Sequence, residues 1–245
     1  MKAVVLAAGY ATRLYPLTLD RPKALLPVGG RPLIDHLLER LAGVDGLEEI
    51  VLVTNSKFAG AFRAWAADWG GDEVRIVDDG TSDEQSRLGA IGDLDLTIRE
   101  RALDDDLLVL AGDNLFSESL APFASFGLER CAPAIGVYDV GDLDAIRRYN
   151  AIELAADDRV IYFEEKPERP RSTLTGIALY FYPRSALGLV REYLEAGNNP
   201  DQPGRLIEWL YPRVPVYAWR VPGRWYDVGS KETLAEADRA FAPSR

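Results

Sequence analysis

The chain has 245 residues, of which 47% are hydrophobic and 27% charged, and its formal net charge is −11. These values are typical of a globular protein with a sizeable core, and they exclude collagen-like and disordered classes. The acidic balance predicts that nucleic acid is not a partner. No apolar run approaches the ~20 residues that cross a bilayer, and the N-terminus lacks the pattern of a signal peptide. We therefore expect no membrane association and a cytoplasmic location.

The first half of the chain alternates strands with helices. Apolar runs predict buried strands at residues 3–8, 50–53, 74–77 and 107–111. Apolar residues at helical spacing, or helix-like composition, predict helices at residues 33–41, 58–69 and 89–99. This alternation is typical of a parallel sheet with helices on both of its faces.

The second half is less regular. Its predicted strands cover residues 134–137, 151–154, 160–164, 177–182 and 214–219, and its predicted helices cover 186–196 and 232–241. Asp157 and Asp158 indicate a hairpin turn between two of those strands. No linker or repeat interrupts the chain. We expect one α/β domain over residues 1–245, with a mixed, mostly parallel central sheet and helices on both faces.

The segment L-A-A-G-Y-A-T-R-L at residues 6–14 directly follows the first strand. A turn of small residues after a strand exposes backbone N–H groups that can cradle phosphate oxygens. The candidate backbone groups belong to Ala7, Ala8 and Gly9. Arg13 offers a planar fork for phosphate, and Lys23 offers a point charge. The segment matches neither G-x-G-x-x-G nor the P-loop, so an ordinary loop with surface cations is the alternative.

Asp113 comes just after the strand predicted at 107–111. Ligands of open α/β sheets gather at the carboxyl ends of the strands, and a carboxylate there can hold Mg²⁺. The alternative is a turn or helix-capping aspartate. The acidic run at residues 104–106 lies at the other end of the same strand, so we expect a solvated turn there.

The two blocks at residues 6–14 and 20–28 (D-R-P-K-A-L-L-P-V) resemble the opening of the sugar-phosphate nucleotidyltransferases. This family includes the glucose-1-phosphate thymidylyl- and uridylyltransferases. Its pattern is roughly L-A-G-G-x-G-T-R-L followed by P-K-x-L-x-P-V. Ala8 and Ala11 stand where the family usually has glycine. The resemblance extends from Val4 to about Glu236 and implies the Rossmann-like nucleotide-diphosphosugar transferase fold.

The resemblance also implies site residues. The family's G-D-N segment places a metal ligand at Asp113 and a contact to the sugar phosphate at Asn114. Its W-x-D-x-G segment corresponds to residues 225–229 and makes Asp227 the second ligand. Its E-K-P motif assigns sugar hydroxyls to Glu165 and the sugar phosphate to Lys166. An exposed strand end with a local Glu–Lys pair is the alternative there.

Three further positions follow the family's pattern less closely. Asn150 stands where the family often has a glycine beside the sugar. Gly176 belongs to a T-G element, although counting back from Pro183 aligns Ala178 instead. Gly89 corresponds to a glycine of the base-recognition segment, whose surrounding residues differ from the thymidylyltransferase pattern.

The implied reaction transfers a nucleotidyl group from a nucleoside triphosphate to a sugar 1-phosphate with Mg²⁺ as cofactor. The resemblance favours dTTP or UTP and glucose 1-phosphate. Residues to about 130 would bind the nucleotide, and residues from about 131 the sugar phosphate. A phosphate monoester is largely dianionic at neutral pH because its second pKa is about 6, so no general base is needed. His36, the only histidine, is therefore read as structural.

Other functions stay open at this point. A metal-dependent glycosyltransferase would need a D-x-D element, which residues 110–114 do not supply. A non-catalytic homologue that binds nucleotide sugars would tend to lose catalytic residues, which this chain retains. The end of the chain leaves no room for a C-terminal β-helix domain, so none is expected, and the sequence is compatible with a homo-oligomer.

Overall fold

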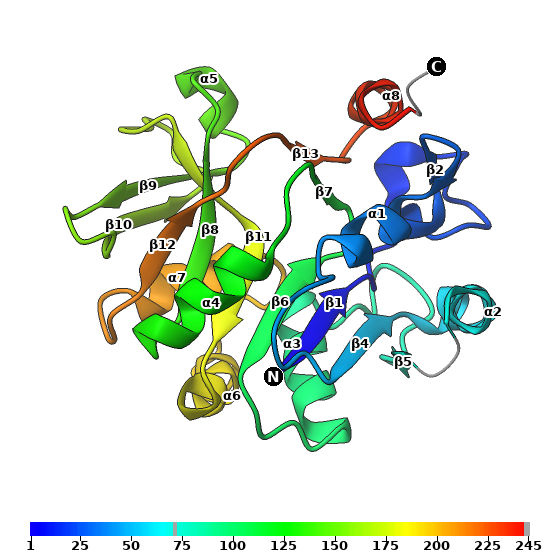
Figure 1. The fold of residues 1–245 in the computed structure, drawn as a ribbon, viewed down its shortest axis with the longest axis horizontal. Helices are drawn as coiled ribbons and strands as arrows, with labels where there is room; N and C mark the ends of the chain where they lie inside the picture. The colour runs from blue at the N-terminus through cyan, green and yellow to red at the C-terminus, as the bar shows by residue number, and fades with distance from the viewer. Residues whose placement is uncertain (71–72, 243–245) are drawn as a thin grey trace.

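A computed structural model describes residues 1–70 and 73–242. Its central sheet has seven strands in the order β12-β8-β11-β6-β1-β4-β5 (Figure 1). Their bounds are Lys2–Leu6 (β1), Glu49–Thr54 (β4), Val74–Asp78 (β5), Leu107–Ala111 (β6), Ala134–Asp139 (β8), Leu174–Tyr182 (β11) and Tyr217–Arg220 (β12). Neighbouring strands are parallel except at β11, which is antiparallel to both β6 and β8. The mixed, mostly parallel sheet predicted from the sequence is confirmed.

Both faces of the sheet are buried, which explains the continuous apolar runs of the parallel strands. Successive residues of a strand point to opposite faces, so Val4 and Val109 enter one core while Val5 and Leu108 enter the other. The first core includes residues of helices α3 (Ala90–Glu100), α6 (Leu187–Glu195) and α7 (Gly204–Leu210). The second includes residues of α1 (Leu33–Glu39), α2 (Ser56–Trp69) and α4 (Ala121–Arg130).

Three small sheets complete the structure. They pair β9 (Asn150–Leu154) with β10 (Val160–Glu165), β7 (Asn114–Phe116) with β13 (Trp225–Asp227), and β2 (Pro27–Val28) with β3 (Arg31–Pro32). The β9–β10 turn contains Asp158 in the left-handed conformation at φ 65°, which confirms the predicted hairpin. The remaining helices are α5 (Leu143–Ile146) and α8 (Lys231–Ala240), with 3₁₀ turns at Thr12–Leu14, Lys23–Leu25 and Arg184–Ala186.

Three helices, α4, α5 and α7, were not predicted. Helix α5 has only four residues, which is too short to show a period. Helix α4 contains Pro122 in its first turn and Gly127 in its body, both of which weaken a helical pattern. Gly127 is needed there because a side chain would collide with the ring of Phe181 on β11. Helix α7 begins at Gly204, directly after Pro203, and both residue types are more typical of a loop than of a helix. The predicted strand at 214–219 begins later, at Tyr217.

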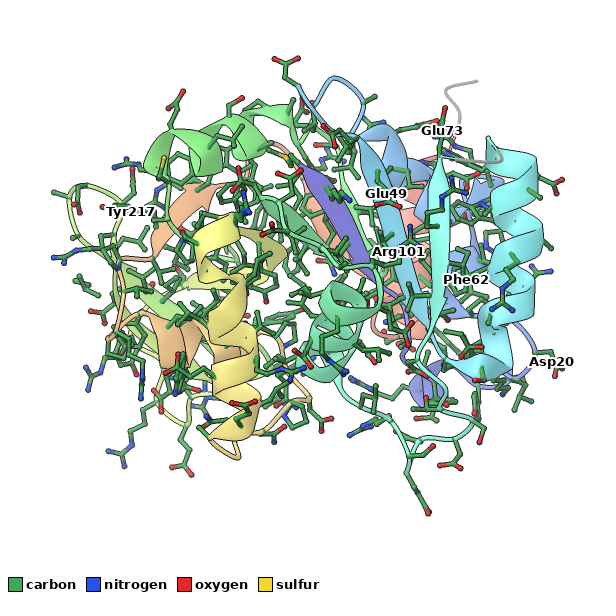
Figure 2. The ribbon with its side chains drawn as sticks, turned by 90° about the horizontal axis from the view of Figure 1, so that it is seen from below. Asp20, Glu49, Phe62, Glu73, Arg101 and Tyr217 are labelled. Carbon is green, nitrogen blue, oxygen red and sulfur yellow. The ribbon has the colours of Figure 1, made fainter. Side chains whose placement is uncertain are left out.

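The two ends of the parallel strands differ. At the amino end, Arg101 donates to Glu49 at 2.8 Å, and the two side chains lie together beside the first residues of β4 (Figure 2). The N-terminal ammonium pairs with Asp105 at 2.7 Å on the same edge. The carboxyl end instead borders a cleft. Among the described residues, no helix is both long and apolar enough to cross a bilayer.

Candidate active site

A cleft of about 540 Å³ opens at the carboxyl ends of β1 and β6. One wall, here called the parallel side, is lined by the ends of β1 and β6, the loops that follow them, the segment before α3 and α3 itself. The other wall, called the antiparallel side, is lined by β11, the β9–β10 hairpin and the segment leading into α7. All but two of the predicted site residues line this cleft; the exceptions are Ala7 and Lys23. Its position agrees with the rule for open α/β sheets.

The loop after β1 is held in place by hydrogen bonds to β4 and to Asn55, the residue that follows β4. Ala7 N–H donates to the Val53 carbonyl at 2.9 Å, and the Asn55 amide donates to the Ala8 carbonyl at 2.8 Å. Asn55 also caps helix α2, so the loop and that helix are positioned together. Ala7 is therefore a support beneath the loop, whereas Ala8, Gly9 and Arg13 reach the cleft.

Gly9 and Gly89 have different reasons to be glycine. A Cβ on Gly9 would have no protein atom within 4 Å, so its missing side chain leaves open room in the cleft. Gly89 precedes α3 with φ 80°, and a Cβ there would lie 2.7 Å from the Pro200 carbonyl oxygen. That carbonyl accepts from Ile91 N–H at 2.9 Å. The close approach at Gly89 is thus made by the protein's own chain, which the sequence did not reveal.

The two predicted metal carboxylates come together on adjoining strands. Asp113 follows β6, and Asp227 ends β13, where it pairs in register with Asn114 of β7. Val228 N–H donates to the Asp113 carbonyl at 3.1 Å, which fixes the two segments to each other. The Asn114 amide donates to Asp113 at 2.8 Å, and the Trp225 indole donates to Asn114. Two carboxylates and an amide from distant parts of the chain therefore share one corner of the cleft.

The charges at this corner are unevenly balanced. Burial raises the pKa of Asp227 to about 6, the Asp113 charge adds to the effect, and Lys23 and Arg13 oppose it. Burial acts to raise the pKa of Asp113 as well, but the Lys23 ammonium and the Asn114 amide hold it below its usual value. Lys23 forms an ion pair with Asp113. Lys23, predicted to bind phosphate, is thus paired with Asp113 in this structure and does not line the cleft.

On the antiparallel side, Glu165 ends β10 and Lys166 directly follows it. Burial raises the pKa of Glu165 to about 7, while Lys166 and Arg205 act to lower it. Lys166 adopts a left-handed φ of 51°, uncommon for a side chain of this size, and its N–H donates to the Tyr149 carbonyl at 2.8 Å. Gly204, the first residue of α7, leaves room for the Glu165 carboxylate, because a Cβ at this position would lie 2.5 Å from Glu165 Oε2.

Asn150 braces β11 through its amide. Its oxygen accepts from Gly176 N–H at 2.6 Å and its NH₂ donates to the Gly176 carbonyl at 2.9 Å. The strand pairing slips between Gly176 and Tyr180, so Ile177 and Ala178 line the cleft beside Gly176. Bulges of this kind are frequent next to functional sites. Gly176 and Ala178, which the sequence left as alternatives, both border the cleft.

The cleft also contains residues that the sequence analysis did not assign to it. They are Leu6, Arg87, Ala90, Asp93, Ala111, Arg148, Tyr149, Ile177, Tyr180, Trp225 and the segment 201–204. Arg87 joins the two walls by an ion pair with Asp201 at 2.8 Å. The turn-rich sequence N-N-P-D-Q-P-G at 198–204 was a signal for an ordered loop. The position of Asp93 inside a helix gave no such signal.

Two predicted exclusions agree with the structure. His36 is buried, its Nε2 bonds to the Val28 carbonyl at 2.8 Å, and burial lowers the pKa of the imidazole. It does not line the cleft. Asp104 is 69% exposed and pairs with Arg184 at the opposite end of β6, so the acidic run is a solvated turn.

Comparisons with known proteins identify the family of the chain. The chain matches the nucleotidyl transferase family over residues 2–243 and belongs to it. It is 30% identical to the UTP–glucose-1-phosphate uridylyltransferase AglF of Haloferax volcanii, over 98% of this chain and 96% of that protein. It is 26% identical to the bifunctional protein GlmU of Methanocaldococcus jannaschii and spans 54% of that protein's length.

The fold is shared with a crystal structure from Bacillus anthracis, assigned as a glucose-1-phosphate thymidylyltransferase in complex with a sucrose. The TM-score is 0.81 at 24% identity, and the match covers 100% of this chain and 96% of that one. Other relatives are named for adenylyl and guanylyl transfer. The chain spans about half the length of several of the curated relatives it matches.

Proposed function

We propose that this protein transfers a nucleotidyl group from a nucleoside triphosphate to a sugar 1-phosphate and releases pyrophosphate. The observation that carries the proposal is the placement of Asp113 and Asp227 between two groups of cations. Arg13 lies on the parallel side and Lys166 on the antiparallel side of one cleft. A carboxylate pair between two phosphate-binding walls suits the joining of two phosphate-containing substrates.

The triphosphate would lie along the parallel side. The backbone at Ala8 and Gly9 would approach its phosphates closely, and the open space at Gly9 supports this placement. Arg13 would bind phosphate oxygens with its guanidinium fork. Lys23, which pairs with Asp113 in this structure, would bind the leaving pyrophosphate after that ion pair opens.

The acceptor would lie on the antiparallel side. Lys166 would align the sugar phosphate for in-line attack on the α-phosphorus, forming the new P–O bond as the bond to pyrophosphate breaks. Glu165 would accept from sugar hydroxyls, with contacts from Asn114 and the backbone at Gly176. Asn150 would act mainly through Gly176, because its amide already holds that residue's N–H and carbonyl.

The residues at the β6 and β13 ends fit a Mg²⁺ ion. Two carboxylates are the set that this cation uses when it shares its remaining positions with phosphates and waters. Bound there, Mg²⁺ would neutralise charge on the α-phosphate. Asp113 would be freed for this role by the release of Lys23.

The substrates we favour are dTTP or UTP with glucose 1-phosphate, because of the resemblance in residues 6–28, 165–167 and 225–229. Pyrophosphate release is the direct test, measured for four triphosphates against several sugar 1-phosphates with Mg²⁺. Release that requires both substrates supports the proposal. A protein that binds nucleotide sugars but releases no pyrophosphate in any combination would be the non-catalytic homologue instead, and sugar transfer from a nucleotide sugar would indicate a glycosyltransferase.

A further inference from the structure

A pair of buried carboxyl groups lies on the parallel side, away from the Asp113–Asp227 corner. Asp93 belongs to the first turns of α3, is only 5% exposed and lines the cleft. Asp79 follows β5. Asp79 Oδ2 and Asp93 Oδ1 are buried, and neither finds a donor among the described residues. The two side chains lie within hydrogen-bonding reach of each other.

A single proton shared between the two carboxyls satisfies both orphan oxygens. Burial and the neighbouring Asp79 charge raise the pKa of Asp93 to about 8, so the pair retains that proton at neutral pH. With the proton held between the two buried atoms, Asp93 keeps lone pairs toward the cleft. It is then a fixed hydrogen-bond acceptor.

The surroundings hold this acceptor rigidly. Asp79 N–H donates to the Thr54 carbonyl at 2.8 Å, and Thr81 N–H donates to Asp79 at 2.6 Å. Tyr10, from the loop after β1, bonds to the Thr81 hydroxyl at 3.1 Å. The loops after β1, β4 and β5 therefore meet behind Asp79. Its position cannot adjust without moving all three.

The position of the pair suits the base of a nucleotide whose phosphates lie over β1. Strand β5 is two strand spacings from β1, about 10 Å, on the side away from the acceptor. Uracil, thymine and guanine present a ring N–H at their pairing edge. Cytosine and adenine present a ring-nitrogen acceptor at the same place, which would leave two acceptors facing each other without a proton.

We propose that Asp93, held by Asp79, selects nucleobases that carry a ring N–H, namely uracil, thymine and guanine, over cytosine and adenine. This deepens the proposed function, because it names the class of triphosphate that the same cleft takes. Asp93 contacts the base, and Asp79 is a positioning residue that acts through it.

The test is equilibrium binding of UTP, dTTP, GTP, CTP and ATP by calorimetry, alongside pyrophosphate release. Wild-type protein should bind the first three triphosphates about 10- to 100-fold more tightly than CTP and ATP, which is the discrimination that good hydrogen bonding to a base edge provides. Asp93→Ala should reduce this ratio to near one. Asp93→Asn should retain it, since its NH₂ can donate to Asp79 while its oxygen faces the cleft. Asp95→Ala is the matched control, because Asp95 is buried in the same helix but pairs with Arg99 and Arg191.

The outcomes separate this inference from the proposed function. A wild-type preference for ATP or CTP, or an Asp93→Ala ratio equal to that of wild type, overturns the base assignment even if pyrophosphate is released. Base-selective binding without pyrophosphate release would retain the base assignment and overturn the reaction. Folding of each variant is checked by its thermal transition, and Asp93→Asn keeps the test informative if the alanine variant is unstable.

Discussion

The two walls of the cleft bring charged groups together by different means. On the parallel side, the loops after β1 and β6 meet because parallel strands end at one edge of a sheet, and ordinary backbone bonds hold them. On the antiparallel side, local irregularities position the groups instead. They are the left-handed backbone of Lys166, the shifted strand pairing after Gly176 and the hydrogen bonds from the Asn150 side chain to Gly176. The parallel side is positioned mainly by topology, with a side-chain bond from Asn55, and the antiparallel side mainly by individual residues. The second should therefore be more easily disturbed by single substitutions away from the ligands.

The largest expected effect lies where the walls meet. Asp113→Asn and Asp227→Asn should each lower kcat by roughly 10²-fold or more, because a bound divalent cation contributes several kcal/mol to charge stabilisation. Excess chelator should do the same to wild-type protein. The measurement is the rate of pyrophosphate release at saturating substrates.

Asp104→Asn is the matched control, since Asp104 sits at the other end of β6 and is exposed. It should leave the rate unchanged. Near-normal turnover in either carboxylate variant, or of wild-type protein in excess chelator, would contradict the assignment of a metal to Asp113 and Asp227.

The next effect separates the two walls. Arg13→Ala should raise KM for the triphosphate, and Lys166→Ala should raise KM for the sugar phosphate, each by roughly 10- to 100-fold, the value of one charge-assisted hydrogen bond. Each variant should change the other substrate's KM far less. Lys57→Ala, on the outer face of α2, is the control. Equal changes for both substrates in both variants would contradict a division between the walls.

The two kinds of wall also explain what the sequence could and could not predict. The parallel strands followed from apolar runs and strand–helix alternation, and the family resemblance then assigned Ala8, Gly9, Arg13 and Asp113, all of which line the cleft. Lys23 was also predicted to bind phosphate, but it does not line the cleft and instead pairs with Asp113, 90 positions away. No local pattern reports such a pairing.

Motif resemblance indicated Asp227 and, on the antiparallel side, Glu165 and Lys166, but it did not indicate the residues that support them. The contact between Gly204 and Glu165, and the approach of Pro200 to Gly89, depend on how α7 and the segment before it pack against the cleft. That packing follows from tertiary contacts. Helix α7 was missed together with the longer α4, whereas the equally short α1 was predicted, so helix length alone does not explain which helices the sequence indicated.

A smaller effect distinguishes the glycines of the two walls. Gly176→Ala should destabilise the protein by about 1–3 kcal/mol, because its Cβ would lie 2.5 Å from Ile135 Cδ1 in a packed core. At ~2–4 °C per kcal/mol, the thermal midpoint should fall by several degrees. Gly9→Ala should leave the midpoint near that of wild type and instead raise KM for the triphosphate. Both are read from thermal melts and initial rates, and a large fall in the Gly9→Ala midpoint would contradict the open space assigned there.

The smallest expected effect concerns the pH dependence of stability on the parallel side. Burial, then the Asp79 charge, raise the pKa of Asp93 to about 8, so the folded protein binds a proton that the unfolded chain has released above about pH 4. Stability from this group is therefore present at low pH and is lost as pH rises toward 8. The other ionisable groups close to the pair are Asp78, Asp83 and Tyr10.

Asp93→Asn removes the titration and should flatten this loss. Relative to wild type, its thermal midpoint should rise between about pH 6 and about pH 8, by ~3 °C or more, which corresponds to ~1 kcal/mol. Melting curves at several pH values and constant ionic strength provide the measurement. Parallel midpoint curves for the two proteins would mean that Asp93 is ionised across this range and that the pair holds no shared proton. The acceptor facing the base would then need another explanation, whereas the positions of Arg13 and Lys166 would be unaffected, since neither depends on this pair.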